Sequence, residues 1–135
     1  MTEGIVMVPG VGVDVVMVRK VKRLLDSHPA ALHEIFTDIE IAYCSARRRP
    51  DEHLAARFAA KEAVLKVLGT GFGAGMRWTD IEVVNDNLGT PRVRLHGETE
   101  RTARRVGAGD ISVSISHSDG VVIAVATCGA LHEAA

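Results

Sequence analysis

The sequence has few residues of the types that mark disulfide-rich or zinc-binding proteins, and few that build aromatic cores. Only 4% of its 135 residues are aromatic, and its two cysteines are Cys44 and Cys128. Two cysteines without a zinc-type spacing provide neither a disulfide framework nor a structural zinc site, and they favour a reduced, cytoplasmic setting. Because aromatic residues are scarce, the core must be built from Val, Ala, Leu and Ile.

The sequence also lacks an excess of charge and a membrane-spanning segment. Its formal net charge is −1, which gives no reason to expect binding to nucleic acid or to a membrane surface. No segment reaches the roughly 20 apolar residues of a membrane helix. The apolar stretch 5–18 is interrupted by Pro9, two glycines and Asp14, and it lacks the basic flank of a signal peptide. We therefore expect no nucleic-acid partner and no membrane association.

The hydrophobic content is sufficient for one domain with a sizeable core, since 47% of the residues are hydrophobic. We expect a single domain over residues 1–135, in which residues 1–9 form an extension before the first motif. Thr37 is a plausible N-cap with Glu40 in the capping-box position, and Gly69 is a natural helix end. We expect helices near residues 18–25, 38–47, 51–68 and 98–106. We expect strands near residues 11–16, 81–84, 92–95, 111–116 and 121–127.

Asp14 is the only charged residue in the β-branched segment that runs from Gly10 to Val16. Strands of this composition are usually buried on at least one face, where a carboxylate needs hydrogen bonds or a cation. Hard divalent cations such as Mg²⁺ take one or two carboxylates together with water and substrate phosphates. Asp14 is thus a candidate metal ligand. The alternative is that it caps the helix beginning near Arg19 or ends the strand.

Glu62 is a candidate for a second carboxylate. At about 100° per residue it lies only about 40° around the helix axis from Phe58, at the edge of the apolar face. Lys66 follows one turn later and is a candidate partner. Two interpretations remain open: an ordinary Glu62–Lys66 surface pair, or a metal or active-site acid acting together with Asp14.

Residues 111–117 alternate Ile or Val with Ser and end at His117. This pattern predicts a strand with one apolar face, and Ser118-Asp119-Gly120 predicts the turn of a hairpin. His117 then lies at a strand end, where a side chain can face a cleft. A structural histidine is the alternative.

Three segments in this order resemble the holo-acyl-carrier-protein synthases, the small trimeric class of 4′-phosphopantetheinyl transferases. They are Gly-Val-Gly-Val-Asp at 10–14, Arg-Phe-Ala-Ala-Lys-Glu-Ala at 57–63 continuing through Lys66 to Gly71, and Ser-Ile-Ser-His at 114–117. Weaker matches are Phe36-Thr37, Tyr43-Cys44 and the strand pair 78–83 and 89–93. The resemblance runs from about residue 10 to residue 127.

The resemblance implies an α+β fold in which an antiparallel sheet packs against a long helix. It implies that the 4′-phosphopantetheine of coenzyme A is transferred to a serine of an apo acyl carrier protein or carrier domain, with release of 3′,5′-ADP. Mg²⁺, or Mn²⁺ in its place, is then held by Asp14 and Glu62, and Lys66 stabilises charge on the phosphates. Further candidate contacts to coenzyme A are Arg57, Lys61, Gly69, Gly71, Ser116 and His117.

Basic residues gather in two places, residues 19–23 and 47–49. A solvated helix face is the ordinary explanation of such clusters. Because acyl carrier proteins are strongly acidic, the resemblance makes Arg19, Lys20 and Arg23 candidates for carrier docking. The family usually carries Arg at the position of Lys20, so a bidentate contact there is not implied. Residues 47–49 are candidates for contact with coenzyme A phosphates.

The resemblance also implies a homotrimer with active sites at subunit boundaries, and Val-rich strands in a small chain with 13 glycines need covering. Two other classes remain open. One is a different Mg²⁺-dependent phosphate or nucleotide enzyme, and the other is a non-catalytic module in which both acids are paired with Lys or Arg. The sequence does not identify the carrier, which is either free or part of a fatty acid or polyketide synthase.

Overall fold

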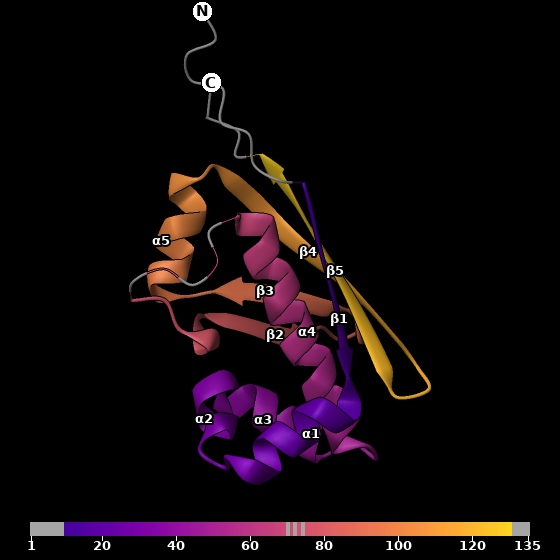
Figure 1. The fold of residues 1–135 in the computed structure, drawn as a ribbon. Helices are drawn as coiled ribbons and strands as arrows, with labels where there is room; N and C mark the ends of the chain where they lie inside the picture. The colour runs from indigo at the N-terminus through magenta and orange to yellow at the C-terminus, as the bar shows by residue number, and fades with distance from the viewer. Residues whose placement is uncertain (1–9, 70, 72, 74, 131–135) are drawn as a thin grey trace, which may run out of the picture.

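The computed structural model describes residues 10–69, 71, 73 and 75–130, and Figure 1 shows its elements. The strands are β1 (Val11–Met17), β2 (Ile81–Asn85), β3 (Pro91–Leu95), β4 (Ala108–Ser118) and β5 (Val121–Ala130). The helices are α1 (Val18–Ser27), α2 (Ala31–Ile35), α3 (Asp38–Ser45), α4 (Pro50–Leu68) and α5 (Gly97–Arg105), with a 3-10 turn, η1, at Trp78–Asp80.

The strands form two antiparallel sheets. The larger has the order β1-β5-β4, and β2 pairs with β3 in the smaller. The predicted β4–β5 hairpin is present, and its turn residues Asp119 and Gly120 have φ values of 52° and 77°. Two consecutive positive φ values are typical of the tight turns that join hairpin strands. β1 pairs with β5 so that Asp14 lies opposite Ala124.

Helix α4 packs against β1 and β5 of the larger sheet and forms the centre of the core (Figure 1). Small side chains on the helix allow this close packing: Ala55, Ala59, Ala60 and Ala63 are fully buried. Pro50 occupies the first turn of α4, where its missing N–H has no cost. The helix ends at Gly69, whose φ of 73° is left-handed. The predicted long helix and its glycine end are confirmed.

Helices α1, α2 and α3 lie together at one end of the molecule (Figure 1), where α1 and α3 contact α4 and α2 contacts α1 and η1. The predicted capping box is confirmed, because Thr37 Oγ1 accepts the N–H of Glu40 at 3.2 Å and Glu40 Oε1 accepts the N–H of Thr37 at 2.9 Å. α3 ends at Ser45, two residues earlier than predicted. α2 was not predicted, since five residues are too few to show a helical period.

The expected fold class is confirmed: the structure is a single α+β domain with an antiparallel sheet packed on the long helix α4. Within the part of the chain that the structure describes, no helix combines the length and apolar character needed to cross a bilayer.

Candidate active site

A glycine allows β1 to lie unusually close to α4. A Cβ atom on Gly12 would lie 2.2 Å from the backbone oxygen of Ala63 and 2.9 Å from the backbone nitrogen of Val67. Contacts this short do not occur, so only glycine fits here. Because side chains alternate along a strand, Asp14 lies on the same face of β1 as Gly12. The glycine thus explains how the carboxylate of Asp14 reaches the surface of α4.

Lys66 of α4 is the direct partner of Asp14. Its Nζ lies 3.1 Å from Asp14 Oδ1 and donates to the backbone oxygen of Val13 at 2.8 Å. The Lys66 side chain is 53% exposed and that of Asp14 is 16% exposed. Ion pairs this accessible to water contribute at most about 1 kcal/mol, so Lys66 can exchange this partner for another at little cost.

Glu62 lies one turn before Lys66 and faces the same side of α4. Burial raises the pKa of its carboxyl, the negative charge of Asp14 raises it further, and Lys66 opposes the shift. The two carboxylates destabilise each other's charged form in this partly buried position, and a bound cation would offset that. Carboxylate oxygens are also the ligands that a hard cation requires.

The donor set is limited to this pair of acids. Among the residues that the structure describes, no group of three or more His, Cys, Asp and Glu side chains is placed to hold a metal. Two carboxylates suit Mg²⁺, because this ion keeps several waters and takes substrate phosphates as further ligands. They would not suffice for a metal whose ligands all come from the protein.

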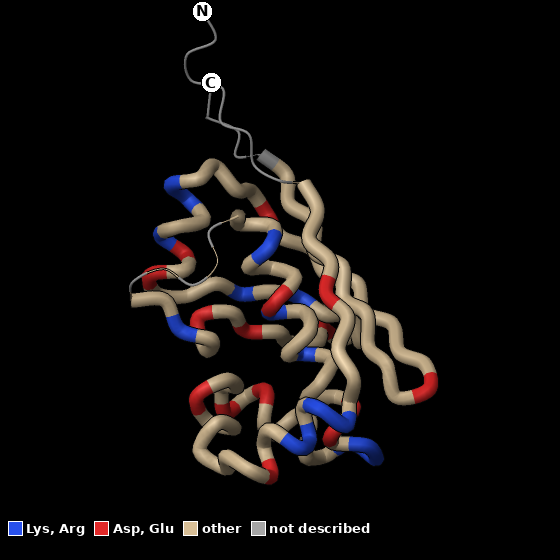
Figure 2. The backbone as a smooth tube through the Cα atoms, viewed as in Figure 1, with Lys and Arg blue, Asp and Glu red and all other residues tan. Residues whose placement is uncertain are grey.

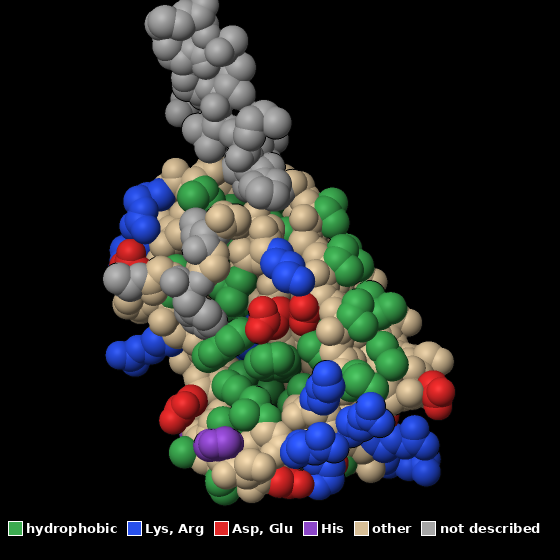
Figure 3. All heavy atoms as spheres, viewed as in Figure 1, with side chains coloured by type: hydrophobic (Ala, Val, Ile, Leu, Met, Phe, Trp, Pro, Cys, Tyr) green, Lys and Arg blue, Asp and Glu red, His purple; other side chains and the backbone are tan. Residues whose placement is uncertain are grey.

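Glu62 and Lys66 line a pocket of about 420 Å³ together with Gly69, Gly71 and Trp78. Gly69 and Gly71 both have positive φ values, 73° and 57°. Figure 3 views this face and shows acidic side chains beside a basic one, bordering an apolar hollow. The structure therefore brings together five of the predicted site residues: Asp14, Glu62, Lys66, Gly69 and Gly71.

Lys61 does not belong to this pocket, and its predicted contact with coenzyme A phosphate is not possible in this structure. The side chain is fully buried on another face of α4. Its ammonium donates to Glu40 Oε1 at 2.7 Å and to the backbone oxygens of Trp78 and Ile81. An ammonium has three N–H donors, so all of them are used within the protein.

Arg57 is also buried, and it lies in a cluster of basic and aromatic side chains near the start of α4. Its guanidinium stacks on the ring of Tyr43 at 4.3 Å and donates to Asn85 Oδ1 at 2.5 Å. Arg47 stacks on the same ring at 3.9 Å. Among the described residues, Arg57 Nε is the buried side-chain atom that has no hydrogen-bond partner, and such an atom needs an explanation.

His53 adds to this cluster. Its ring lies edge-on to Tyr43 with centroids 6.0 Å apart. Burial lowers the pKa of His53, and the positive charges of Arg57 and Arg47 lower it further. Neither Tyr43 nor His53 was predicted from the sequence as a site residue. A signal was available, because each lies four residues before an arginine, the spacing at which helical side chains meet.

Ser116 and His117 lie away from the pocket of Glu62. Both are exposed at the end of β4, and His117 Nδ1 forms an ion pair with Glu52 of α4. Glu52 and Glu62 are ten residues apart, which is about 15 Å along a helix. Within one chain, the structure thus separates the predicted His117 contact from the two acids.

The predicted docking residues Arg19, Lys20 and Arg23 are exposed on α1, and Figure 2 shows the basic residues gathered there. Lys22, between them, is paired with Asp26 at 2.7 Å. A pocket of about 300 Å³ lies next to Lys20, and its remaining lining is apolar: Val15, Val16, Met17, Val21, Leu24 and Phe58. This pocket was not predicted from the sequence, because it forms only where β1, α1 and α4 meet.

Comparison with known proteins shows the family to which this chain belongs. Residues 10–126 match the family model described as the 4′-phosphopantetheinyl transferase superfamily. The holo-[acyl-carrier-protein] synthase of Moorella thermoacetica is 47% identical over 115 residues, which cover 85% of this chain and 89% of that protein.

Solved structures of holo-[acyl-carrier-protein] synthases are also similar to this chain. The crystal structure of holo-[acyl-carrier-protein] synthase from Neisseria meningitidis superposes with a TM-score of 0.82 at 29% identity, covering 91% of this chain and 99% of that one. A holo-(acyl-carrier-protein) synthase from Bacillus anthracis, solved in complex with CoA (3′,5′-ADP), has a TM-score of 0.72 at 31% identity, covering 90% and 96%. The chain therefore belongs to the holo-[acyl-carrier-protein] synthases of the 4′-phosphopantetheinyl transferase superfamily.

Proposed function

We propose that this protein transfers the 4′-phosphopantetheine group of coenzyme A to a serine of an apo acyl carrier protein and releases 3′,5′-ADP. The observation that carries the proposal is a pocket lined by Glu62 and Lys66, with Asp14 paired to Lys66, in a member of this family. Two acids and one accessible ammonium provide what phosphoryl transfer needs from a protein, which is positioning and charge neutralisation.

Asp14 and Glu62 would hold Mg²⁺, or Mn²⁺ in its place, with water and substrate oxygens completing the coordination. The bound ion supplies charge neutralisation on the pyrophosphate of coenzyme A. The raised pKa of Glu62 supports this assignment, because burial and then the negative charge of Asp14 disfavour its ionised form, and a cation would offset both effects.

In the transfer, the serine oxygen forms a bond to the β-phosphorus and the bond from that phosphorus to the departing 3′,5′-ADP oxygen breaks. Lys66 would leave Asp14 and donate to a phosphate oxygen, placing positive charge where negative charge develops. The serine hydroxyl loses its proton either to a water molecule or to one of the two carboxylates. Gly69 and Gly71 leave room for the phosphates to approach the backbone at the pocket wall.

The cluster of Arg57, Arg47, Tyr43 and His53 would hold the nucleotide phosphates of coenzyme A. Arg47 is exposed and stacks on the Tyr43 ring, so it would contact the phosphates, whereas the buried Arg57 stacks on the same ring and would hold it in place. His117 and Ser116 would contribute at the same end of α4, since the partner of His117, Glu52, lies next to His53 in the chain.

A homotrimer would complete the site. Val11, Val13, Val15 and Ile123 are between 43% and 58% exposed on β1 and β5. An exposed apolar strand face of this kind favours association. Closed cyclic packing would cover it and would bring the hairpin end of one subunit to the acid pair of the next.

The carrier would dock on α1. Arg19, Lys20 and Arg23 would attract an acidic carrier, and the adjacent pocket with Leu24 and Phe58 would accept an apolar side chain from it. Phe58 lies one turn before Glu62 on α4, so a carrier bound there has its serine close to the acids.

Mass spectrometry of apo carrier proteins incubated with coenzyme A and Mg²⁺ tests the proposal directly. We expect the carrier to gain the mass of phosphopantetheine in the presence of the protein and Mg²⁺, and not with EDTA. No mass gain on any free or synthase-borne carrier would contradict the proposed activity. Calorimetric titration of coenzyme A with and without Mg²⁺ then separates a different phosphate enzyme, which binds with the metal, from a module that shows no metal-dependent binding.

A further inference from the structure

A fully buried ion pair lies directly behind the candidate active site. Lys61 Nζ and Glu40 Oε1 are 2.7 Å apart and both side chains are 0% exposed. Burying two charges costs more than their attraction returns in many proteins, so such a pair is weak evidence for a stabilising role. We therefore consider that the pair holds neighbouring groups in place, and its contacts indicate which groups these are.

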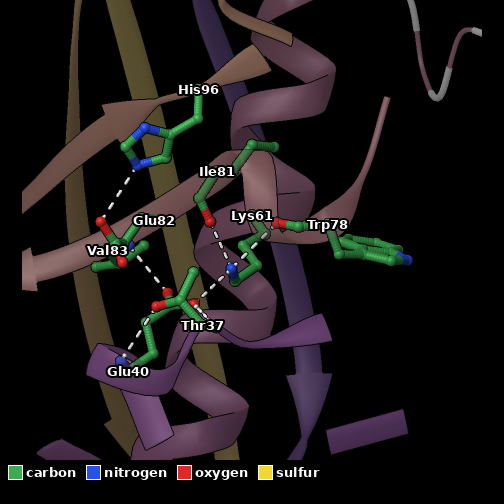
Figure 4. Close-up of polar contacts among 8 residues, drawn as sticks. All are labelled: Thr37, Glu40, Lys61, Trp78, Ile81, Glu82, Val83 and His96. Carbon is green, nitrogen blue, oxygen red and sulfur yellow. Dashed lines mark hydrogen bonds and ion pairs between the residues drawn. The ribbon is translucent and has the colours of Figure 1, made fainter. Parts of the chain in front are cut away.

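The pair connects three segments that are distant in sequence, which are α3, α4 and the continuous stretch of η1 and β2 (Figure 4). Glu40 Oε1 accepts the Thr37 N–H at the start of α3, and Oε2 accepts the Val83 N–H of β2 at 2.9 Å. The ammonium of Lys61 on α4 donates to the backbone oxygens of Trp78, at 3.2 Å, and Ile81. These two carbonyls begin and follow η1, so the ammonium fixes the position of the turn that leads into β2.

Trp78 is the point at which this network reaches the candidate site. Its side chain lines the pocket of Glu62 and Lys66, and it also lines the neighbouring pocket of about 470 Å³ that includes His33 and Met76. It stacks on Phe58, with ring centroids 5.3 Å apart at 32°. Trp78 is therefore the wall between the two pockets, and a shift of its backbone would widen the pocket of Glu62.

We propose that Lys61 and Glu40 are positioning residues, which hold Trp78 as the wall of the transfer pocket through the Trp78 carbonyl. The expected effect on catalysis rests on the proposed function, whereas the contact between Lys61 and the Trp78 carbonyl does not depend on it. Lys61 takes no part in binding phosphate, because its three donors are used inside the protein. A displacement of about 1 Å in such a wall can cost on the order of 100-fold in rate.

The double variant Lys61→Gln with Glu40→Gln, called the neutral pair below, tests this proposal. It removes both charges and retains donors and acceptors for the backbone groups. The chain has one tryptophan, so intrinsic fluorescence reports on Trp78 alone. We expect a shifted emission maximum, stronger quenching by acrylamide and a fall in kcat of about tenfold or more. The KM values for coenzyme A and for the carrier should stay within about threefold of wild type, because binding groups are untouched.

Val106→Ala is the matched control, since it truncates a partly buried core side chain at the end of α5. It should lower the melting temperature with wild-type Trp78 emission and wild-type kcat. The proposal is overturned if the neutral pair has wild-type emission and kcat, or if Val106→Ala loses as much kcat at an equal loss of melting temperature.

Trp78→Ala decides the question if the neutral pair does not fold. This variant keeps the carbonyl that Lys61 binds and removes only the wall, so we expect folded protein with a fall in kcat as large as in the neutral pair. A wild-type kcat in Trp78→Ala would contradict the proposal. A wild-type protein without any transferase activity would instead refute the proposed function, and Trp78 emission would still show whether Lys61 holds Trp78.

Discussion

At the scale of single residues, the candidate site depends on how charge is distributed around α4. Glu62 and Lys66 face the pocket, whereas Lys61, next to Glu62 in the sequence, is fully buried on another face. The two lysines therefore differ in whether they can bind a substrate. An accessible ammonium can exchange partners, but a buried one with three fixed acceptors cannot.

Removal of either acid should abolish metal-dependent transfer. We expect Asp14→Ala and Glu62→Gln to lower kcat/KM by at least about 100-fold, which is roughly 2.7 kcal/mol of transition-state stabilisation. Rates measured over a range of Mg²⁺ concentrations check this. Glu98→Gln, on the surface of α5, is the control and should behave as wild type. Wild-type rates at limiting Mg²⁺ in either variant would exclude the metal-site assignment.

The raised pKa of Glu62 predicts a pH dependence of stability in the metal-free protein. A carboxyl whose folded pKa lies above its ordinary value of 4.5 stabilises the fold fully below that value, and the contribution is lost as pH rises through the folded pKa. Relative to Glu62→Gln, the wild type should therefore lose melting temperature in EDTA as pH rises above about 4.5. Added Mg²⁺ should reverse this difference at neutral pH. A difference that does not vary with pH would contradict the shift.

At the scale of elements, the site depends on the contact between β1 and α4. Gly12 has no room for a side chain, whereas a Cβ on Gly10 would meet nothing within 4 Å. These two glycines of one motif therefore have different roles. Gly12 sets the distance between the strand and the helix that carry Asp14 and Glu62.

Gly12→Ala should force β1 and α4 apart. Overpacking of this kind costs about 1–3 kcal/mol, and it should also lower kcat because it displaces Asp14 from Glu62. Gly10→Ala is the matched control and should stay within about 0.5 kcal/mol of wild type. Chemical denaturation and transfer rates measure the two effects. Equal behaviour of the two variants would show that the close approach does not set the site geometry.

The exposed cations of α1 should control association with the carrier. We expect Arg23→Glu or Lys20→Glu to raise the KM for the carrier by about tenfold at low ionic strength and to leave the KM for coenzyme A unchanged, since such charges mainly steer encounter and are screened by salt. Arg104→Glu on α5 makes the same charge change away from α1 and serves as the control. An unchanged carrier KM with unchanged salt dependence would place docking elsewhere.

At the scale of the whole molecule, the two candidate regions on one chain lie at opposite ends of α4. His117 contacts Glu52 near its start, and Glu62 and Lys66 lie near its end. The exposed valines of β1 alternate with Gly12 and Asp14, so they lie on the face of the strand that points away from α4. Association through this face would therefore place a second subunit against the strand that carries Asp14.

Disruption of the β1 face should abolish both assembly and activity. We expect Val13→Asp or Val15→Asp to sediment as a monomer with less than about 1% of wild-type activity, because a buried unpaired charge is incompatible with a packed interface. Leu88→Asp is the control, since Leu88 is 91% exposed in the β2–β3 turn.

Subunit exchange gives a further test of the shared site. Asp14→Ala and His117→Ala are each expected to be inactive alone and to recover activity when mixed, if each site draws residues from two chains. A fully active monomer would rule out the trimer as the working unit.

Local features of this protein could be predicted from the amino-acid sequence alone. The capping box at Thr37 and Glu40, the helix end at Gly69 and the hairpin turn at Asp119 and Gly120 depend on contacts within a few residues, so composition and spacing predict them. The acid pair was predictable for a related reason. A lone carboxylate in an apolar strand or helix face has few physical explanations, and a cation is one of them.

The direction of each side chain and the partners it meets depend on how distant segments pack, and the sequence did not predict them. Lys61 and Lys66 are both lysines on one helix, and nothing local distinguishes the one that Glu40 and two carbonyls bury from the one beside Asp14. The pocket beside Lys20, the stacking of Arg57 on Tyr43 and the wall at Trp78 arise where distant segments pack. Burial and partnership are properties of that packing, and they decide which charged groups remain available for chemistry.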